Sequence, residues 1–171
     1  MTPSARRRPA PRAEPRAEPQ TRLRAALNVL VSREPRLAAP PSATIASVVQ
    51  LVLRAEGVRA ATISIALVTN PTIRRLNTRY LSHRRATDVI AFALTGTASA
   101  VVGDVYLAPS VARASAAEIG ISAREEILRL VIHGVLHVLG YDHPAGAGRT
   151  RCVMWRRQEL LLARALRRTP Q

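Results

Sequence analysis

The chain has 171 residues, of which 47% are hydrophobic and 3% aromatic, so Ala, Val, Leu and Ile must build most of its core. Its formal net charge is +15 and all 26 of its basic residues are arginine, a composition that attracts polyanions such as nucleic acid. Its one cysteine, Cys152, excludes an intramolecular disulfide, and no stretch approaches the ~20 apolar residues that a membrane-spanning helix needs.

The N-terminal residues 1–20 are rich in Pro and Arg and contain almost no apolar residue other than Ala. Such a segment cannot bury enough surface to offset the entropy that it would lose on ordering. It also lacks the apolar core of a secretory signal. We therefore predict a disordered basic tail over 1–20 and a single folded domain over 21–171.

The first half of the folded domain alternates strand and helix patterns. Short apolar runs predict strands over 26–31 and 61–69. Between them, Ser42 is a candidate N-cap for a helix whose apolar residues recur at helical spacing and which ends at Gly57. A helix over about 70–80 follows, because an Asn-Pro pair is typical of a helix start.

The second half begins with a predicted charged loop over 81–86 and two strands, over 87–94 and 101–107. Helices are then predicted over about 110–119, 123–139 and 147–166. The order of strand, helix, strand, helix, two strands and a run of helices predicts an α/β (α+β) fold. We expect a small mixed sheet of about four strands packed with about five helices.

Three of the four histidines fall within the segment 133–143, which reads HGVLHVLGYDH. Its flanks have the apolar period of a helix, so His133 and His137 lie on one face with Cβ atoms roughly 5–6 Å apart. Imidazoles at that separation can share a metal through bonds of ~2.0–2.1 Å. Gly140 favours a left-handed turn that brings His143 back toward them. The sequence thus predicts three metal ligands, His133, His137 and His143, at the end of a central helix.

Zinc is the metal that this ligand set favours. Neutral imidazole suits zinc, and three histidines leave one tetrahedral position for a water molecule whose pKa would fall toward 7. Cys152 lies nine residues beyond His143, so a closed structural site of three histidines and a cysteine is an alternative. We predict one Zn²⁺ ion in an open, hydrolytic site.

The group that moves a proton is not assigned by the pattern. Gly134 stands where zinc proteases of the HExxH type carry a general-base glutamate, which disfavours peptide cleavage. Asp142 lies between two ligand positions and is a candidate hydrogen-bond partner of a ligand histidine. The candidate acid/base carboxylates that we place in the core are Asp88, Asp104, Glu118, Glu125, Glu126 and Asp142.

The segment 133–143 resembles the signature H-G-x-L-H-L-x-G-Y-D-H of the YbeY family and departs from it only at Val138. Two further stretches are similar to the same family: Leu76-Asn77 with Tyr80 and then TDVIAF (87–92), and GDV (103–105). The resemblance runs from about Ala26 to the C-terminus.

This resemblance implies a zinc-dependent endoribonuclease that cleaves single-stranded RNA in ribosomal RNA maturation and ribosome quality control. It implies the bacterial cytoplasm as location, RNA and ribosomal subunits as partners, and a small mixed sheet with helices. It carries the zinc ligands onto His133, His137 and His143.

Two departures from the family concern the predicted loop. Some members carry an arginine where this chain has Leu81, so Arg79, Arg84 or Arg85 would have to supply that charge, and Ala86 replaces a frequent proline. We expect His83 to be solvated. Two alternatives to the ribonuclease remain open: a zinc metallopeptidase or other hydrolase, and a non-catalytic ribosome-binding protein with a structural zinc.

Overall fold

The computed structural model describes residues 26–81, 87–94, 100–144 and 146–169. The predicted tail over 1–20 and most of the predicted charged loop, with His83, Arg84, Arg85 and Ala86, lie outside the described residues. Within the described ranges, no helix is both long and apolar enough to cross a membrane.

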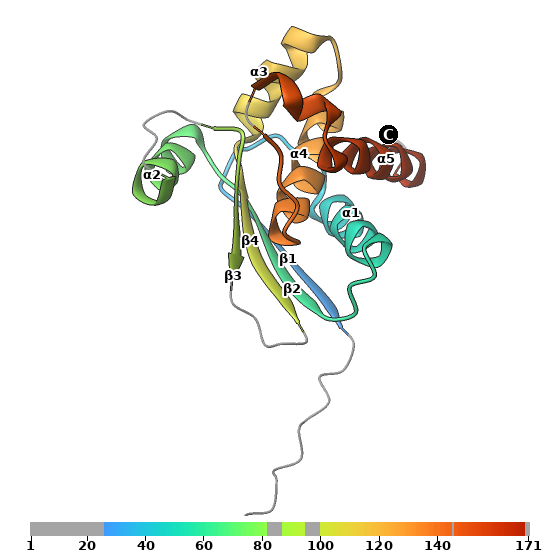
Figure 1. The fold of residues 1–171 in the computed structure, drawn as a ribbon. Coiled ribbons are helices and arrows are strands. Elements are labelled where there is room, and N and C mark those ends of the chain that lie inside the picture. Colours follow the sequence, from blue (N-terminus) through green and yellow to red (C-terminus); the bar gives the residue numbers. More distant parts are fainter. Residues whose placement is uncertain (1–25, 82–86, 95–99, 145, 170–171) are drawn as a thin grey trace, which may run out of the picture.

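The centre of the fold is a four-stranded mixed sheet in the order β1-β2-β4-β3 (Figure 1). Strands β1 (Leu27–Arg33), β2 (Ala61–Leu67) and β4 (Val101–Leu107) run parallel to one another. Strand β3 (Val89–Leu94) pairs antiparallel with β4. The predicted mixed sheet and the predicted order of elements are therefore confirmed.

Helices lie on both faces of this sheet, and more of them pack on one face than on the other. They are α1 (Ser42–Ala55), α2 (Asn70–Leu81), α3 (Pro109–Ile119), α4 (Ala123–Val138) and α5 (Val153–Arg168), with a 3₁₀ helix η1 (Gly146–Arg151) before the last one. Helices α1 and α4 pack on one face and α5 packs outside them, whereas α2 lies on the far side of β3 (Figure 1).

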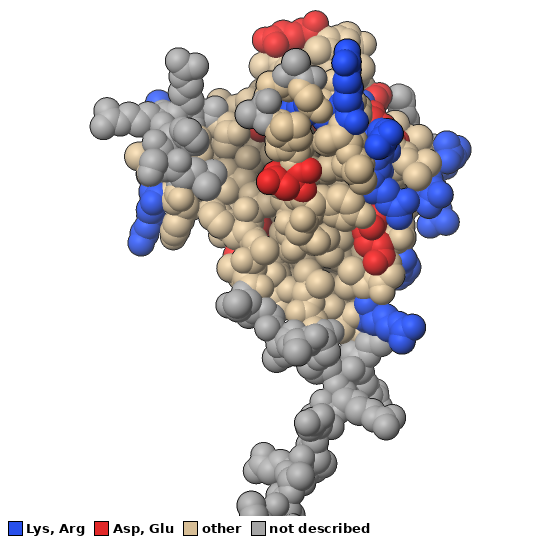
Figure 2. All heavy atoms as spheres, in the orientation of Figure 1, with Lys and Arg blue, Asp and Glu red and all other residues tan. Residues whose placement is uncertain are grey.

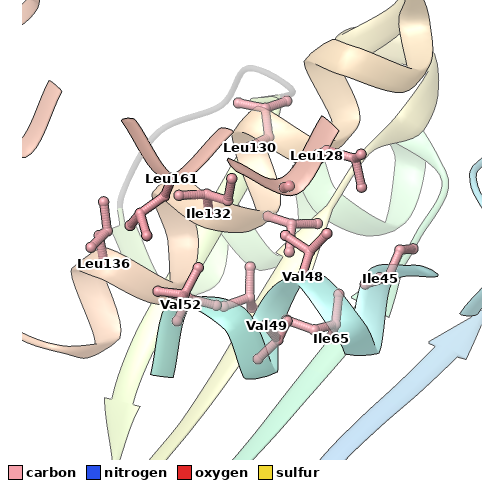
Figure 3. Packing of buried hydrophobic residues seen from close by; sticks show 14 of the residues in the cluster. Ile45, Val48, Val49, Val52, Ile65, Leu128, Leu130, Ile132, Leu136 and Leu161 are labelled. Atoms are coloured by element: carbon pink, nitrogen blue, oxygen red, sulfur yellow. The ribbon is translucent and has the colours of Figure 1, made fainter. Parts of the chain in front are cut away.

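Side-chain alternation along the strands produces two apolar clusters, one on each face. The larger one joins the sheet to α1, α4 and α5, and includes Ile65, Val105 and Leu136, all fully buried (Figure 3). The smaller one forms under α2 around Ile73 and Ile90. Because the larger cluster surrounds α4, that helix is held on three sides and is a rigid support for anything at its end.

Helix α4 can approach the sheet closely because glycines stand at the contacts. A Cβ atom on Gly134 would lie 2.5 Å from Val105 Cγ1, inside van der Waals contact. A Cβ atom on Gly103 of β4 would clash with Val138 in the same way. The residue at 134 is therefore fixed by packing, and a glutamate there would not fit this arrangement.

Two predicted helix starts differ from the structure. The helix predicted over 147–166 is two elements, η1 and α5, separated by Cys152, whose Sγ accepts a hydrogen bond from the Trp155 N–H at 3.4 Å as the N-cap of α5. Ser42 is the first residue of α1 and makes no capping bond, because the N-cap position is Pro41. Apolar spacing alone does not separate a 3₁₀ turn from the helix that follows it.

Candidate metal centre

The structure brings together the three histidines that the sequence predicted. His133 and His137 lie on the last turns of α4, and His143 lies in the segment that follows. One ring nitrogen from each of the three lies within 4.8 Å of the others. The two helical histidines place their Nε2 atoms 3.1 Å apart. A tetrahedral metal with bonds of ~2.0–2.1 Å would separate its ligand atoms by about 3.4 Å, so the spacing fits a shared ion.

The end of α4 explains how His143 returns to the other two. Gly140 has a φ of +88°, and its N–H donates to the His137 carbonyl at 2.9 Å. The Tyr141 N–H donates to the Leu136 carbonyl at 3.0 Å. This pair of bonds is the Schellman arrangement, which reverses the chain directly after the helix. The predicted role of Gly140 is confirmed.

Each histidine holds its Nδ1 atom against an oxygen acceptor. His133 Nδ1 lies 2.8 Å from Gln158 Oε1, and His137 Nδ1 lies 3.0 Å from the Tyr141 carbonyl. His143 Nδ1 lies 3.2 Å from the Pro144 carbonyl. Because these oxygens only accept, each Nδ1 carries the proton and each Nε2 keeps its lone pair. The three lone pairs are the ones that a metal would take.

Gln158 positions His133 and is itself held in place by its neighbours. Its Nε2 donates to Glu159 Oε1 at 3.0 Å, which turns its own Oε1 toward His133. Arg129 holds Glu159 in turn, through a 3.0 Å ion pair. Gln158 is 2% exposed, so its contact with His133 lies inside the protein and fixes the His133 ring.

The electrostatics of the cluster favour neutral imidazoles. Burial lowers the pKa of His133 to about 4, although its bond to Gln158 opposes that shift. Burial, and then the charge of His143, lower the pKa of His137. A histidine binds a metal through its neutral form, so the environment holds both rings in the ligating state at neutral pH.

The cluster opens on a cleft of about 570 Å³. One wall is the segment 87–93 that includes β3, and the other is the end of α4 with Asp142, His143 and Arg149. His133 is buried, whereas His137 and His143 are partly exposed. The three histidines thus present their free nitrogens to a hollow that a substrate can enter.

Of the six candidate carboxylates, the cleft is lined by two, Asp88 and Asp142. Asp142 Oδ1 accepts from the His143 N–H at 2.7 Å, and Asp88 Oδ1 accepts from the Val89 N–H at 2.9 Å. Glu125 and Glu126 pair with Arg129 at 3.0 and 2.6 Å, near the start of α4. Asp104 and Glu118 do not line the cleft. Asp142 therefore contacts the backbone of His143 rather than the ring of a histidine.

Cys152 is not part of the cluster. Its Sγ donates to the Arg149 carbonyl at 3.0 Å and caps α5. Among the described residues, the group able to hold a metal consists of the three histidines alone. The closed site with a fourth cysteine ligand thus receives no support from the geometry.

Two residues of the centre, Gln158 and Arg149, have no counterpart in the sequence predictions. Gln158 lies 25 positions from His133 and reaches it only because α5 packs against α4. Arg149 is one of 26 basic residues, and no local pattern separates it from the rest. Tertiary packing brings Gln158 to the ring of His133 and Arg149 to the cleft.

The comparisons with known proteins agree with this geometry. The family model described as endoribonuclease YbeY matches residues 36–165, which include the three histidines, Arg149 and Gln158. The chain belongs to the YbeY family. The resemblance stated from the signature segment is confirmed, and membership supports a nuclease role.

Curated relatives of this YbeY-family chain carry the same description. An endoribonuclease YbeY from Carboxydothermus hydrogenoformans is 39% identical over 125 residues, covering 72% of this chain and 86% of that protein. One from Chlorobaculum parvum is 35% identical over 122 residues, covering 71% and 84%. One from a Sulfurihydrogenibium species is 44% identical over 84 residues, and that match spans 55% of the relative's length.

A solution structure of a Thermotoga maritima protein has the same fold as this YbeY-family chain. The TM-score is 0.59 at 23% sequence identity, and the match covers 82% of this chain and 90% of that one. At this identity the likeness concerns the fold alone.

Proposed function

We propose that this chain is a zinc-dependent endoribonuclease that cleaves single-stranded RNA in ribosomal RNA maturation and ribosome quality control, in the cytoplasm, with ribosomal subunits as partners. The observation that carries the proposal is the open cluster of three histidine Nε2 atoms on a polar cleft. Family membership supports the ribonuclease part.

His133, His137 and His143 would hold the ion. Their Nδ1 atoms are engaged with oxygen acceptors, so their Nε2 atoms are the free donors, and neutral nitrogen donors suit zinc. A bound zinc would supply Lewis-acid polarisation of a phosphoryl oxygen and a lowered pKa for a coordinated water. Such an ion would compensate the approach of two lone pairs at 3.1 Å.

The protein's own side chains would bind and orient the RNA. Arg149 lines the cleft and carries a fork of donors that matches a phosphate. Asp88 uses Oδ1 to hold the Val89 N–H, and among the described residues Oδ2 makes no hydrogen bond. Asp142 also lines the cleft and holds the His143 N–H through its Oδ1 in the same way, so we assign Asp88 and Asp142 as the candidate proton acceptors.

The residues of the cleft favour RNA over a peptide substrate. A zinc protease of the HExxH type carries its general base at the position of Gly134. Gly134 lies so close to Val105 that a side chain there would clash. The net charge of +15 opposes binding of basic substrates and favours a polyanion.

The test is cleavage of single-stranded ribosomal RNA by the zinc-loaded protein, with and without a chelator, beside His143→Ala. His143 lies after α4 and is partly exposed, so this variant keeps the helix core intact. We expect both chelation and the substitution to abolish cleavage. Equal cleavage by parent and variant would refute the catalytic assignment.

RNA binding, stability and peptide turnover, measured on the same proteins, separate the other functions. A non-catalytic zinc protein would bind the RNA, lose stability on chelation and cleave nothing. A peptidase would turn over a peptide library in a zinc-dependent way after nuclease contaminants have been removed.

A further inference from the structure

A second basic surface lies between α1 and α5. Two adjoining hollows of about 540 and 190 Å³ run along these helices and share Leu51, Arg54 and Arg168 as lining residues. Arg164 and Arg167 complete the basic lining of the larger hollow. We name this feature the α1/α5 groove. Figure 2 shows basic side chains gathered on the side of the molecule where Figure 1 draws α1 and α5.

The groove is a fixed part of the fold. Its floor includes Val48, Leu51 and Ala165, which belong to the main apolar cluster. At one end Arg157 Nε contacts Glu56 Oε1 at 2.6 Å and its Nη2 donates to the Ala55 carbonyl at 2.9 Å, which ties α5 to the end of α1. The spacing of the two helices that carry the arginines is thus set before any ligand arrives.

The charge of the groove is not compensated by the described residues. None of its four arginines forms an ion pair with a described carboxylate, and Arg54 donates only to Gln50 Oε1, at 3.2 Å. Glu56, the acidic residue at the end of α1, is already paired with Arg157. Like charges at positions i, i+3 and i+4 of a helix, such as Arg164, Arg167 and Arg168, repel one another. An anion would relieve that repulsion.

The groove is separate from the metal centre. The two hollows share no lining residue with the cleft that holds the histidines. Helix α4 lies between them, since it packs against β3 on the cleft side and against α1 and α5 on the other. A ligand in the groove therefore lies outside the cleavage cleft. Only a long ligand could occupy the groove and the cleft at the same time.

We propose that the α1/α5 groove binds the phosphodiester backbone of RNA beyond the segment that occupies the metal cleft. This inference rests on the proposed ribonuclease function. Guanidinium forks match phosphates along a strand, and four of them line one groove. The lining contains no aromatic side chain on which a base could stack, so the contact would be independent of sequence.

The test compares two triple variants that lose the same charge. The groove variant is Arg54→Gln, Arg164→Gln and Arg168→Gln. The matched control is Arg59→Gln, Arg113→Gln and Arg156→Gln, three exposed arginines that line neither the groove nor the metal cleft. Binding of fluorescent single-stranded RNA is measured by anisotropy over a range of salt, with a chelator present so that cleavage plays no part. Thermal midpoints verify that both variants fold.

We expect the groove variant to bind RNA of about 30 nucleotides on the order of tenfold more weakly than the control, and to bind RNA of about 6 nucleotides as the control does. The slope of log affinity against log salt should fall by about 2 for the longer RNA, because about 0.7 is lost per contact with a single strand. Equal affinities of the two variants for the longer RNA would overturn the inference.

Three further outcomes are decided by the same proteins. If the groove substitutions weaken binding of polyglutamate as much as binding of RNA, the groove does not prefer nucleic acid and the RNA assignment is overturned. A parent protein that cleaves RNA while both variants bind alike refutes this inference only. A parent that binds through the groove and cleaves nothing refutes the ribonuclease proposal and leaves the groove assignment standing.

Discussion

At the scale of single residues, the metal centre depends on groups that do not themselves face the cleft. Gln158 accepts a hydrogen bond from the Nδ1–H of His133 and is held in turn by Glu159. It therefore selects the tautomer of His133 that leaves Nε2 free. Gly134 allows α4 to lie directly on Val105. One residue sets the chemistry of a ligand, and the other sets the position of the helix that carries it.

The Gln158→Leu variant should bind zinc about 10–100-fold more weakly than the parent, because loss of a ligand's hydrogen-bond partner frees its ring and its tautomer. Gln158→Glu keeps an acceptor oxygen at the same reach and should restore most of the affinity. Competition with a chromophoric chelator measures both values. An unchanged affinity of Gln158→Leu would show that His133 needs no partner.

The Gly134→Ala variant should lower the free energy of unfolding by about 1–3 kcal/mol, because its methyl group would lie 2.5 Å from Val105 Cγ1. Denaturant titration measures the change. The double variant Gly134→Ala with Val105→Ala relieves the clash and should lose less than the sum of the two single changes. Strict additivity would argue against this contact as the cause.

At the scale of elements, the segment after α4 is held by a contact between distant parts of the chain. Tyr141 donates its hydroxyl hydrogen to Glu56 Oε2 at 2.8 Å, and Arg157 binds the other oxygen of Glu56 at 2.6 Å. The Tyr141 carbonyl meanwhile accepts from His137. The end of α1, the start of α5 and the segment that carries His143 are thus joined at one carboxylate.

The Tyr141→Phe variant should lower the free energy of unfolding by about 1–2 kcal/mol, since it removes a half-buried hydrogen bond to a charged group. It should also weaken zinc binding, because His143 follows two residues later. Tyr80→Phe is the matched control: Tyr80 is 54% exposed on α2, and its change should stay within about 0.5 kcal/mol. Equal effects of the two substitutions would contradict the proposed role of the Glu56 contact.

At the scale of the whole molecule, the two basic features lie on opposite sides of α4. Arg149 lines the metal cleft, and Arg54, Arg164, Arg167 and Arg168 line the α1/α5 groove. A chain with a net charge of +15 attracts RNA over its whole surface, and the arginines that line the two hollows concentrate that attraction there. The fold therefore offers a long RNA strand two basic hollows, and one of them contains the three histidines.

Removal of zinc should lower the stability of the whole domain, because an ion that binds only the folded state stabilises it by about 4 kcal/mol at 1,000 times its Kd. The thermal midpoint of the zinc-loaded parent should fall on chelation, whereas that of His143→Ala should move much less. Calorimetry measures both. The same fall in parent and variant would place the stabilising ion elsewhere.

Apart from the boundary between η1 and α5, the strands and helices could be predicted from the sequence, because their apolar periods are local properties of the chain. The sequence also determined that His133, His137 and Gly140 follow one another on a helix and its end, since spacing on a helix is fixed by its pitch. That these histidines bind zinc stays a prediction.

The surroundings of that helix depend on how the elements pack, which the sequence did not predict. The contact of Gln158 and the α1/α5 groove come from the packing of α5 on α4 and α1, and η1 carries Arg149 to the cleft. Gly134 is required by a contact with β4. Local spacing carries no information about which elements meet. A residue whose role is to support another across 25 positions, as Gln158 supports His133, is visible only once the chain is folded.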